Sequence, residues 1–190
     1  MQTNENQKQI AGAIIIAGVL IAGAILLKGN ISGKTITGNG EFANITLAKI
    51  DKNDRTLGNT KAKVALVMYE DFQCPFCGAI SGLVSDTDAI KYLKDRVPNW
   101  TPLMTGVNEY IKNGSVLYAY RDWAFLGPES VRASEAARCA GDQGKFWEYH
   151  DYLYTHQNGE NEGAFADSKL KSFTKELELN SADFDKCLDE

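Results

Sequence analysis

The feature that most restricts the fold of this chain is a pair of cysteines that comes just after a short apolar segment. Val64 to Tyr69 is a continuous apolar run, as expected of a central strand that is buried on both faces. After four intervening residues the chain reads Cys74-Pro75-Phe76-Cys77. Proline suits the first turn of a helix, and no other proline occurs through Leu93. The sequence therefore predicts a strand, a tight turn and a helix through about Leu93, with Leu83 among the residues available for burial.

This arrangement of the two cysteines suits redox chemistry. The first turn of a helix leaves backbone N–H groups unpaired, and the helix dipole adds partial positive charge, so both favour a thiolate at Cys74. We therefore predict that Cys74 is the attacking cysteine that forms mixed disulfides. Cys77 lies one turn further in, where we expect it to be less exposed and to resolve the mixed disulfide. Pro75 and Phe76 complete the motif without adding a cation.

A zinc half-site is the competing interpretation of the cysteine pair. A tetrahedral structural site needs a second pair of Cys or His ligands at a spacing of about two to four residues. The remaining candidates are Cys139, His150, His156 and Cys187, and no two of them are spaced in that way. His150 and His156 lie six residues apart, on different faces of a helix, and are interpreted as packing or solvent-facing residues. No metal and no other cofactor is therefore expected.

Two further cysteines occur on predicted helices. Cys139 lies among three alanines, and Cys187 shares an apolar face with Phe184 and Leu188. Two inert buried thiols would fit this pattern, and so would a disulfide. In an oxidising compartment two helix-borne cysteines that face one core are expected to be joined. Closing a loop of about 48 residues would contribute roughly 4 kcal/mol in the chain-entropy model, and we predict a structural Cys139–Cys187 disulfide.

Hydrophobic periodicity elsewhere predicts a small sheet followed by a block of helices. A weak edge strand is expected at 43–50, a loop at 97–106, a short helix at 107–112, a second buried strand at 115–120, and helices at 127–141, 145–155 and 168–179. Ser181 is interpreted as the N-cap of a last helix. The aromatic residues of segment 145–155 are interpreted as core. The pattern as a whole indicates the α/β class.

The N-terminal segment differs in composition from the rest. Ile10 to Leu27 is an uncharged run of eighteen residues between Lys8 and Lys28. As a helix it would be about 27 Å long, near the lower limit for crossing a bilayer. A cleaved signal peptide and a buried helix are the alternatives, but the run is long for a signal peptide, lacks an A-x-A-like cleavage site and shows no polar stripe. We predict a transmembrane anchor at 10–27, a flexible glycine-rich linker at 28–40 and a folded domain at 41–190.

The charge of the chain argues against nucleic acid as a partner. The net charge is −5 at pH 7, and Lys and Arg are scattered along the sequence. A protein that neutralises phosphates needs a basic stripe or patch. Because the hydrophobic share of 44% and the charged share of 24% are near globular averages, one soluble domain behind the apolar run is expected.

Three segments are distinctive when they are taken together: Tyr69 to Cys77, Tyr120 to Trp123 and Glu135 to His150. They resemble the DsbA-like thioredoxin family of anchored or secreted bacterial disulfide oxidoreductases, over about residues 60–190. The resemblance implies a thioredoxin-like fold with a helical insertion, in which Cys74 and Cys77 oxidise thiols of exported proteins. It also implies reoxidation by a quinone-linked membrane partner similar to DsbB or VKOR. Residues 1–9 would then lie in the cytoplasm and the domain outside it, held at the cell membrane by a single span.

One departure from the family concerns an acidic residue near the cysteines. Members often carry a buried acid six positions before the first cysteine, and here that position is Met68. Glu70 lies four positions before Cys74 and, by strand alternation, on the same face as Met68 but nearer the turn. The sequence alone assigns no role to Glu70.

A second departure concerns the end of the chain. The family continues beyond the helix of Cys187 with a further helix, a cis-proline loop opposite the active cysteines and a closing β-hairpin. The four prolines here, at 75, 98, 102 and 128, lie elsewhere. We therefore expect a domain that is incomplete at its C-terminus and lacks the hairpin, with an open sheet edge and weak or no oxidase activity.

Oxidation of exported thiols is the function that these features favour. A disulfide reductase or isomerase of the same fold is the first alternative, because C-x-x-C chemistry runs in either direction according to potential and partner. A membrane-tethered binding module with an inactive redox site is the second. The reduction potential separates the oxidase from the reductase, and turnover of a dithiol substrate tests the binding module.

Overall fold

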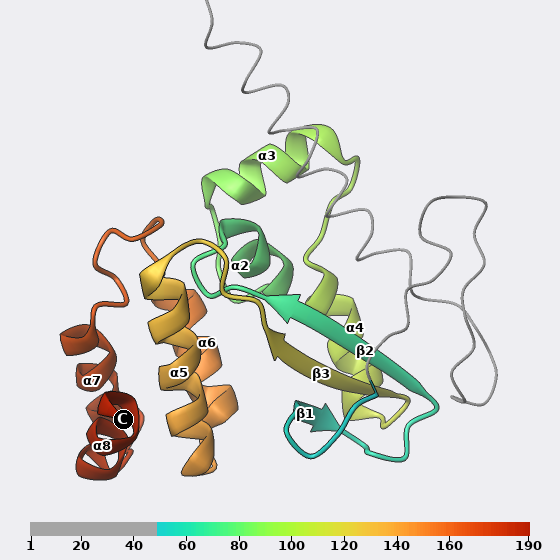
Figure 1. Cartoon of the computed structure of the whole chain (residues 1–190). Coiled ribbons are helices and arrows are strands. Elements are labelled where there is room, and N and C mark those ends of the chain that lie inside the picture. The colour runs from blue at the N-terminus through green and yellow to red at the C-terminus, as the bar shows by residue number, and fades with distance from the viewer. Residues whose placement is uncertain (1–48) are drawn as a thin grey trace, which may run out of the picture. The chain divides into compact units, whose positions relative to one another are not determined.

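Strands β2 (Val64–Glu70) and β3 (Val116–Asp122) pair in parallel at the centre of the fold in the computed structural model, which describes residues 49–190. A short strand, β1 (Arg55–Gly58), pairs antiparallel with the other edge of β3, so the sheet has the order β1-β3-β2 (Figure 1). The register places Met68 opposite Tyr120. The two apolar strands expected from the sequence are present. β2, however, is an edge strand of the described sheet and not the expected central strand buried on both faces, because only β3 pairs with it and Val64 and Tyr69 are 47% and 40% exposed.

Strand β1 is absent from the sequence-based expectations, and tertiary contacts explain why it forms. Arg121 of β3 donates hydrogen bonds of 2.5 and 2.8 Å to the carboxylate of Asp54. Trp147 Nε1 donates to the carbonyl of Thr56 at 3.2 Å. These contacts hold a strand of only four residues against β3. The edge strand expected at 43–50 lies, for residues 43–48, outside the described residues, and residues 49 and 50 are in neither a helix nor a strand.

The helix that follows β2 is much shorter than expected. α2 (Pro75–Ser81) ends at Gly82, whose φ of 75° lies in the left-handed region that glycine adopts most easily. A separate helix, α3 (Asp88–Arg96), begins after Thr87, whose hydroxyl caps its first turn. The prediction of one continuous helix is therefore wrong. Leu83, which was expected to be buried, is 37% exposed in the connection between the two helices.

The second half of the described chain is rich in helices, as expected. α4 (Leu103–Lys112) begins directly after Pro102 and takes up part of the expected loop. The later helices are α5 (Pro128–Asp142), α6 (Phe146–His156), α7 (Asp167–Glu176) and α8 (Ser181–Asp189). α5 lies beside α6, and α7 and α8 pack on the other side of α5 (Figure 1). Asn180 caps α8 in place of Ser181, because its side chain accepts hydrogen bonds from two N–H groups of the first turn.

Aromatic side chains fill the core between the sheet and the helices. Phe72, Tyr120, Tyr149 and Tyr154 are buried there, which confirms the aromatic residues around α6 as core. His150 is also buried, whereas the side chain of the other histidine of α6 is exposed. The two histidines therefore lie on different faces of the helix.

Residues 52–190 form one compact unit. Within residues 49–190 no helix is long and apolar enough to cross a membrane. The anchor expected at 10–27, the linker expected at 28–40 and the start of the domain expected at 41–190 lie outside the described residues.

Candidate active site

The two cysteines of the C-x-x-C motif lie where β2 passes into α2. Cys74 is the N-cap of α2, with extended backbone angles, and Pro75 takes the first helical position. The N–H of Cys74 donates to the carbonyl of Asp71 at 3.0 Å, and its own carbonyl accepts from the N–H of Gly78 at 3.1 Å. Cys74 and Cys77 are free thiols, and both are half-buried. The turn therefore presents two sulfurs at the start of one helix, as the sequence predicts.

The environment separates the acidities of the two thiols. A hydrogen bond from the thiol of Cys77 lowers the pKa of Cys74, and the backbone N–H groups of Cys77 and Phe76 lower it further against the opposing effect of burial. The same hydrogen bond, followed by burial and by the charge of Cys74, raises the pKa of Cys77. Cys74 is therefore the sulfur suited to exist as a thiolate, while Cys77 holds its proton.

A buried carboxylate organises the turn before Cys74. Asp71 is fully buried, and its Oδ1 accepts a hydrogen bond from the N–H of Gln73 at 2.8 Å. Its Oδ2 accepts from the N–H groups of Phe125 and Leu126 at 2.8 and 3.0 Å. One side chain thus joins the cysteine turn to the loop that follows β3.

Gln73 makes a second connection from the same turn. Its side chain is 1% exposed. Its amide nitrogen donates to Ser130 Oγ of α5 at 2.7 Å, and its amide oxygen accepts from the N–H of Asn161 at 2.6 Å. The sequence interpretation missed Asp71 and Gln73. The available signal was two polar residues flanking the buried Phe72 directly before the motif.

Glu70 lies on the core face of β2, as strand alternation predicts, because Met68 and Glu70 are buried and Tyr69 is 40% exposed. The hydroxyl of Tyr118 donates to Glu70 Oε1, and the hydroxyl of Tyr154 donates to Glu70 Oε2, each at 2.6 Å. The negative charge of Glu70 contributes to the raised pKa of Cys77. Glu70 is therefore a buried acid whose charge acts on Cys77. It lies two residues later in the strand than Met68, the position at which the family often carries its acid.

A cavity of about 250 Å³ reaches this carboxylate. Six of its lining residues come from β2, β3, α4 and α6: Glu70, Tyr118, Met104, Ile111, Trp147 and His150. Most of these side chains are apolar or aromatic. The cavity gives solvent a route to Glu70 that does not pass over the cysteines.

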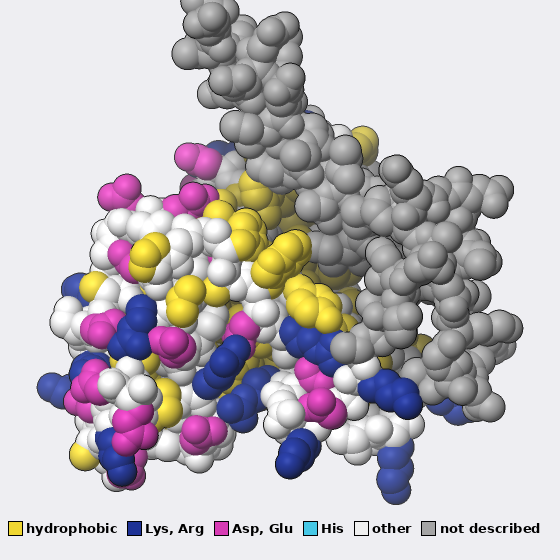
Figure 2. All heavy atoms as spheres, viewed as in Figure 1, with side chains coloured by type: hydrophobic (Ala, Val, Ile, Leu, Met, Phe, Trp, Pro, Cys, Tyr) yellow, Lys and Arg dark blue, Asp and Glu magenta, His cyan; other side chains and the backbone are white. Residues whose placement is uncertain are grey.

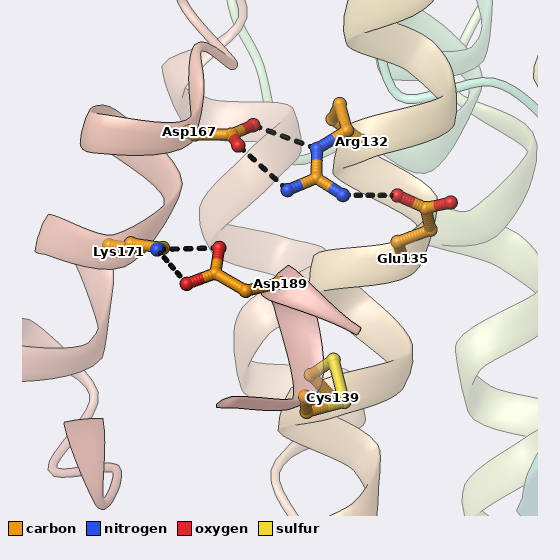
Figure 3. A network of polar contacts seen from close by, with 7 residues as sticks. Arg132, Glu135, Cys139, Asp167, Lys171 and Asp189 are labelled. Carbon is orange, nitrogen blue, oxygen red and sulfur yellow. Dashed lines mark hydrogen bonds and ion pairs between the residues drawn. A yellow bond between two sulfur atoms is a disulfide. The ribbon is translucent and has the colours of Figure 1, made fainter. Parts of the chain in front are cut away.

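The other two cysteines are joined by a disulfide in the structure. Cys139 of α5 and Cys187 of α8 have Cα atoms 5.8 Å apart, within the usual range for disulfides. Figure 3 shows this bond near ion pairs that connect α7 to its neighbours. Arg132 of α5 pairs with Asp167, and Lys171 pairs with Asp189 of α8, both at 2.7 Å. The bond and the ion pairs together tie α5, α7 and α8 into one block.

Both histidines contact neighbouring side chains of α6. His150 Nδ1 lies 2.8 Å from Asp151 Oδ1, and its ring packs edge-on against Tyr154. His156 stacks on Tyr152. In the part of the chain that the structure describes, no group of three or more His, Cys, Asp or Glu side chains is arranged to hold a metal ion.

A C-x-x-C motif at the start of a helix, directly after a parallel strand of a mixed sheet, defines a thioredoxin-like redox domain. A family model described as Thioredoxin matches residues 51–95 and 103–190. The chain therefore belongs to this thioredoxin family, and its resemblance to DsbA-like proteins is confirmed.

The chain is also similar to individual known proteins. It is 26% identical over 175 residues to the probable disulfide bond formation protein D of Bacillus anthracis, a match that covers 91% of this chain and 69% of the relative. It is 32% identical over 131 residues to the Na(+)/H(+) antiporter NhaA 1 of Salinispora arenicola, with 67% of this chain but only 16% of the relative covered. The crystal structure of oxidised BdbD from Bacillus subtilis shares the fold, with a TM-score of 0.54, 20% identity and coverage of 73% of this chain and 66% of that one.

Proposed function

We propose that this chain is a thiol–disulfide oxidoreductase that introduces disulfides into exported polypeptides. The observation that carries the proposal is the split in acidity at the start of α2, where the pKa of Cys74 is lowered and that of Cys77 is raised. Membership of the thioredoxin family and the likeness to the Bacillus anthracis protein, whose name refers to disulfide bond formation, support the same function.

The reaction transfers two electrons from a substrate dithiol to the Cys74–Cys77 disulfide. A substrate thiolate attacks the sulfur of Cys74, the bond between Cys74 and Cys77 breaks, and Cys77 leaves as a thiolate that takes up a proton. The second substrate thiolate then attacks the substrate sulfur of the mixed disulfide, and Cys74 leaves as a thiolate. The substrate is oxidised to a disulfide, and the chain is left with both cysteines reduced.

Glu70 is suited to handle the proton of Cys77 in this sequence. It is 3% exposed, its charge acts on Cys77, and the cavity beside it leads to solvent. A buried thiolate that is formed without a proton donor would be costly. We infer that the carboxylate of Glu70 keeps the proton on Cys77 in the reduced motif, because a negative charge near the sulfur disfavours a thiolate there.

The acidity of Cys74 favours oxidation over reduction. A lowered thiol pKa stabilises the reduced form of the motif at neutral pH, and a stabilised reduced form makes the disulfide a stronger oxidant. Regeneration needs an electron acceptor, which we propose is a quinone-linked membrane protein of the DsbB or VKOR type. The chain would thus pass electrons from exported thiols to the membrane.

We further propose that the domain works outside the cytoplasm and is held at the cell membrane by residues 10–27. The Cys139–Cys187 disulfide supports this placement, because structural disulfides persist in oxidising compartments and are rare where thiols are kept reduced. Labelling of cysteines in intact cells with a reagent that does not cross the membrane tests it. Reaction of Cys74 only after permeabilisation would contradict the placement.

The direct test of the activity uses the full chain in detergent micelles. The oxidised protein is mixed with a reduced, unfolded polypeptide that contains two cysteines, and substrate disulfide is measured against a Cys74→Ser control. We expect one substrate disulfide for each protein molecule, and none with the control. Reduction of a disulfide substrate by the reduced chain without this oxidation would indicate a reductase, and neither reaction would indicate a binding module.

A further inference from the structure

The side chain of Gln73, the residue directly before Cys74, is buried and hydrogen-bonded at both ends of its amide. It is 1% exposed. Its oxygen accepts from the backbone N–H of Asn161 at 2.6 Å, and its nitrogen donates to Ser130 Oγ at 2.7 Å. Because a backbone N–H can only donate, the amide oxygen must face Asn161 and the amide nitrogen must face Ser130. The two contacts therefore fix the side chain in one orientation.

Asn161 is in turn held by the segment between β3 and α5. Its side chain donates to the carbonyl of Leu126 at 2.7 Å and accepts from the N–H of Glu129 at 3.3 Å. Its φ of 56° lies in the left-handed region, which a residue other than glycine keeps only where its surroundings hold it. A Cβ at Gly127 would lie 2.5 Å from the side-chain nitrogen of Asn161. The oxygen of Gln73 thus meets a donor whose position is set by the fold.

The contacts of Gln73 differ from the ion pairs that join the helices at the surface. Figure 2 shows Lys, Arg, Asp and Glu side chains mixed over the part of the molecule formed by α5, α7 and α8. Salt screens exposed pairs of this kind, and each contributes little. Gln73 and Ser130 are neutral, and Ser130 is 0% exposed. Their hydrogen bond should therefore keep its geometry at high salt and at any pH near neutrality.

The position of residue 73 affects the sulfur of Cys74, because Cys74 is the N-cap of α2 and residue 73 leads directly into it. The thiol of Cys77, followed by the backbone N–H groups of Cys77 and Phe76, lowers the pKa of Cys74. Hydrogen bonds weaken steeply as the donor angle departs from linearity. These donors therefore stabilise a thiolate fully only while the chain enters the helix at a fixed angle.

We propose that Gln73 is a positioning residue for the reactive cysteine: held by Ser130 and Asn161, it keeps the sulfur of Cys74 beside the donors of the first turn of α2. This inference rests on the proposed function and extends it to residues outside the cysteine motif. An amide suits the site because one end must accept from an N–H group while the other donates to a hydroxyl. The side chain in Gln73→Met fills the same space, but no directional contact holds it.

The test measures the pH dependence of Cys74 alkylation in the reduced full chain, with the labelled peptide identified by mass spectrometry. In Gln73→Met and in Ser130→Ala the midpoint should move to higher pH, and below the midpoint the rate should fall by about threefold. Ser134→Ala is the matched control. Ser134 also lies on α5 and is 4% exposed, but its hydroxyl has no hydrogen-bond partner within the described part of the chain. This control should leave the midpoint unchanged.

The double variant Gln73→Met/Ser130→Ala separates positioning from stability. Ser130→Ala alone leaves a buried donor without its acceptor, whereas replacing both partners by apolar groups can be nearly neutral. Denaturant unfolding should therefore recover toward the native curve in the double variant, while the alkylation midpoint stays at the higher pH. Recovery of both, or a native midpoint in either single variant, would overturn the positioning role.

Two further measurements complete the test. The shift in Gln73→Met should persist at high salt, where exposed ion pairs are screened, and its loss there would assign the effect to surface charge and overturn the proposal. Oxidation of a reduced polypeptide with two cysteines is followed with the same proteins. If the native chain fails to oxidise it while the midpoint still depends on Gln73, the oxidase is overturned and the positioning role stands.

Discussion

The hydroxyl of Tyr154 lies 2.6 Å from Glu70 Oε2 and so connects α6 to the core face of β2. The hydroxyl of Tyr118 donates a hydrogen bond of 2.6 Å to Oε1 of the same carboxylate. All three side chains are buried, and burial, followed by the charge of Glu70, raises the pKa of both phenols well above the usual range. The phenols therefore remain hydrogen-bond donors to Glu70 at any pH near neutrality.

The first prediction concerns this contact. Tyr154→Phe leaves one oxygen of a buried carboxylate without a donor, and we expect the free energy of unfolding to fall by about 1.5–3 kcal/mol. Denaturant unfolding measures the change. In a Glu70→Leu background the same substitution should cost much less, because no carboxylate remains to be satisfied. Equal costs in the two backgrounds would show that the hydrogen bond contributes nothing beyond packing.

A second prediction follows from the hydrogen bond that the thiol of Cys77 donates to Cys74. In the reduced protein the rate of Cys74 alkylation should rise with pH through a midpoint below about 8.5, the usual value for a free thiol. Cys77→Ala removes the donor that most lowers the pKa of Cys74, so the midpoint should move to higher pH. Cys77→Ser retains a donor and should shift it less. A midpoint that is the same in both variants would contradict the role of Cys77 as donor.

The sign of the pH effect on stability follows from the same shift. The pKa of Cys74 is lower in the folded protein than in the unfolded chain. Its contribution to the stability of the reduced form is therefore present above the unfolded pKa and is lost as pH falls through the folded value. We expect the excess stability of reduced native protein over Cys74→Ala to decrease on acidification in that window. Unfolding curves at several pH values measure it, and an increase on acidification would be inconsistent with a lowered pKa.

The Cys139–Cys187 disulfide gives a third prediction. The bond closes a loop with a sequence separation of 48 residues, and its replacement in Cys139→Ala/Cys187→Ala should lower the free energy of unfolding by about 4 kcal/mol in the chain-entropy model. The alkylation profile of Cys74 should stay the same. If removal costs less than about 1 kcal/mol, the ion pairs and the core alone hold α5 and α8 together.

The fourth prediction addresses Asp71. Asp71→Ala removes the acceptor of three backbone N–H groups, and a buried unsatisfied donor costs about 1–3 kcal/mol. The amides of Phe125 and Leu126 should exchange hydrogen faster, because the loop that follows β3 loses its acceptor. Asp86→Ala is the control, since the side chain of Asp86 is 88% exposed. Unchanged exchange at Phe125 and Leu126 would show that other contacts hold the loop.

Much of the site could be read from the sequence because its signals are local. The apolar run Val64–Tyr69 and the proline at position 75 lie within one strand and one turn, where burial and dihedral preference act directly. The helices of the second half follow their periodicity for the same reason. Cys139 and Cys187 could be paired because few cysteines were available and each had an apolar helix face.

The tertiary structure alone decided the contacts that act on the site. β1 exists because it pairs with β3, and four residues carry too little local signal to predict it. The two tyrosines whose hydroxyls donate to Glu70 lie 48 and 84 residues further along the chain. The two loop amides that donate to Asp71 lie 54 and 55 residues further along. A buried carboxylate must be satisfied by some donor. Sequence states that requirement, but only the packing of strand, loop and helix determines which donors meet it.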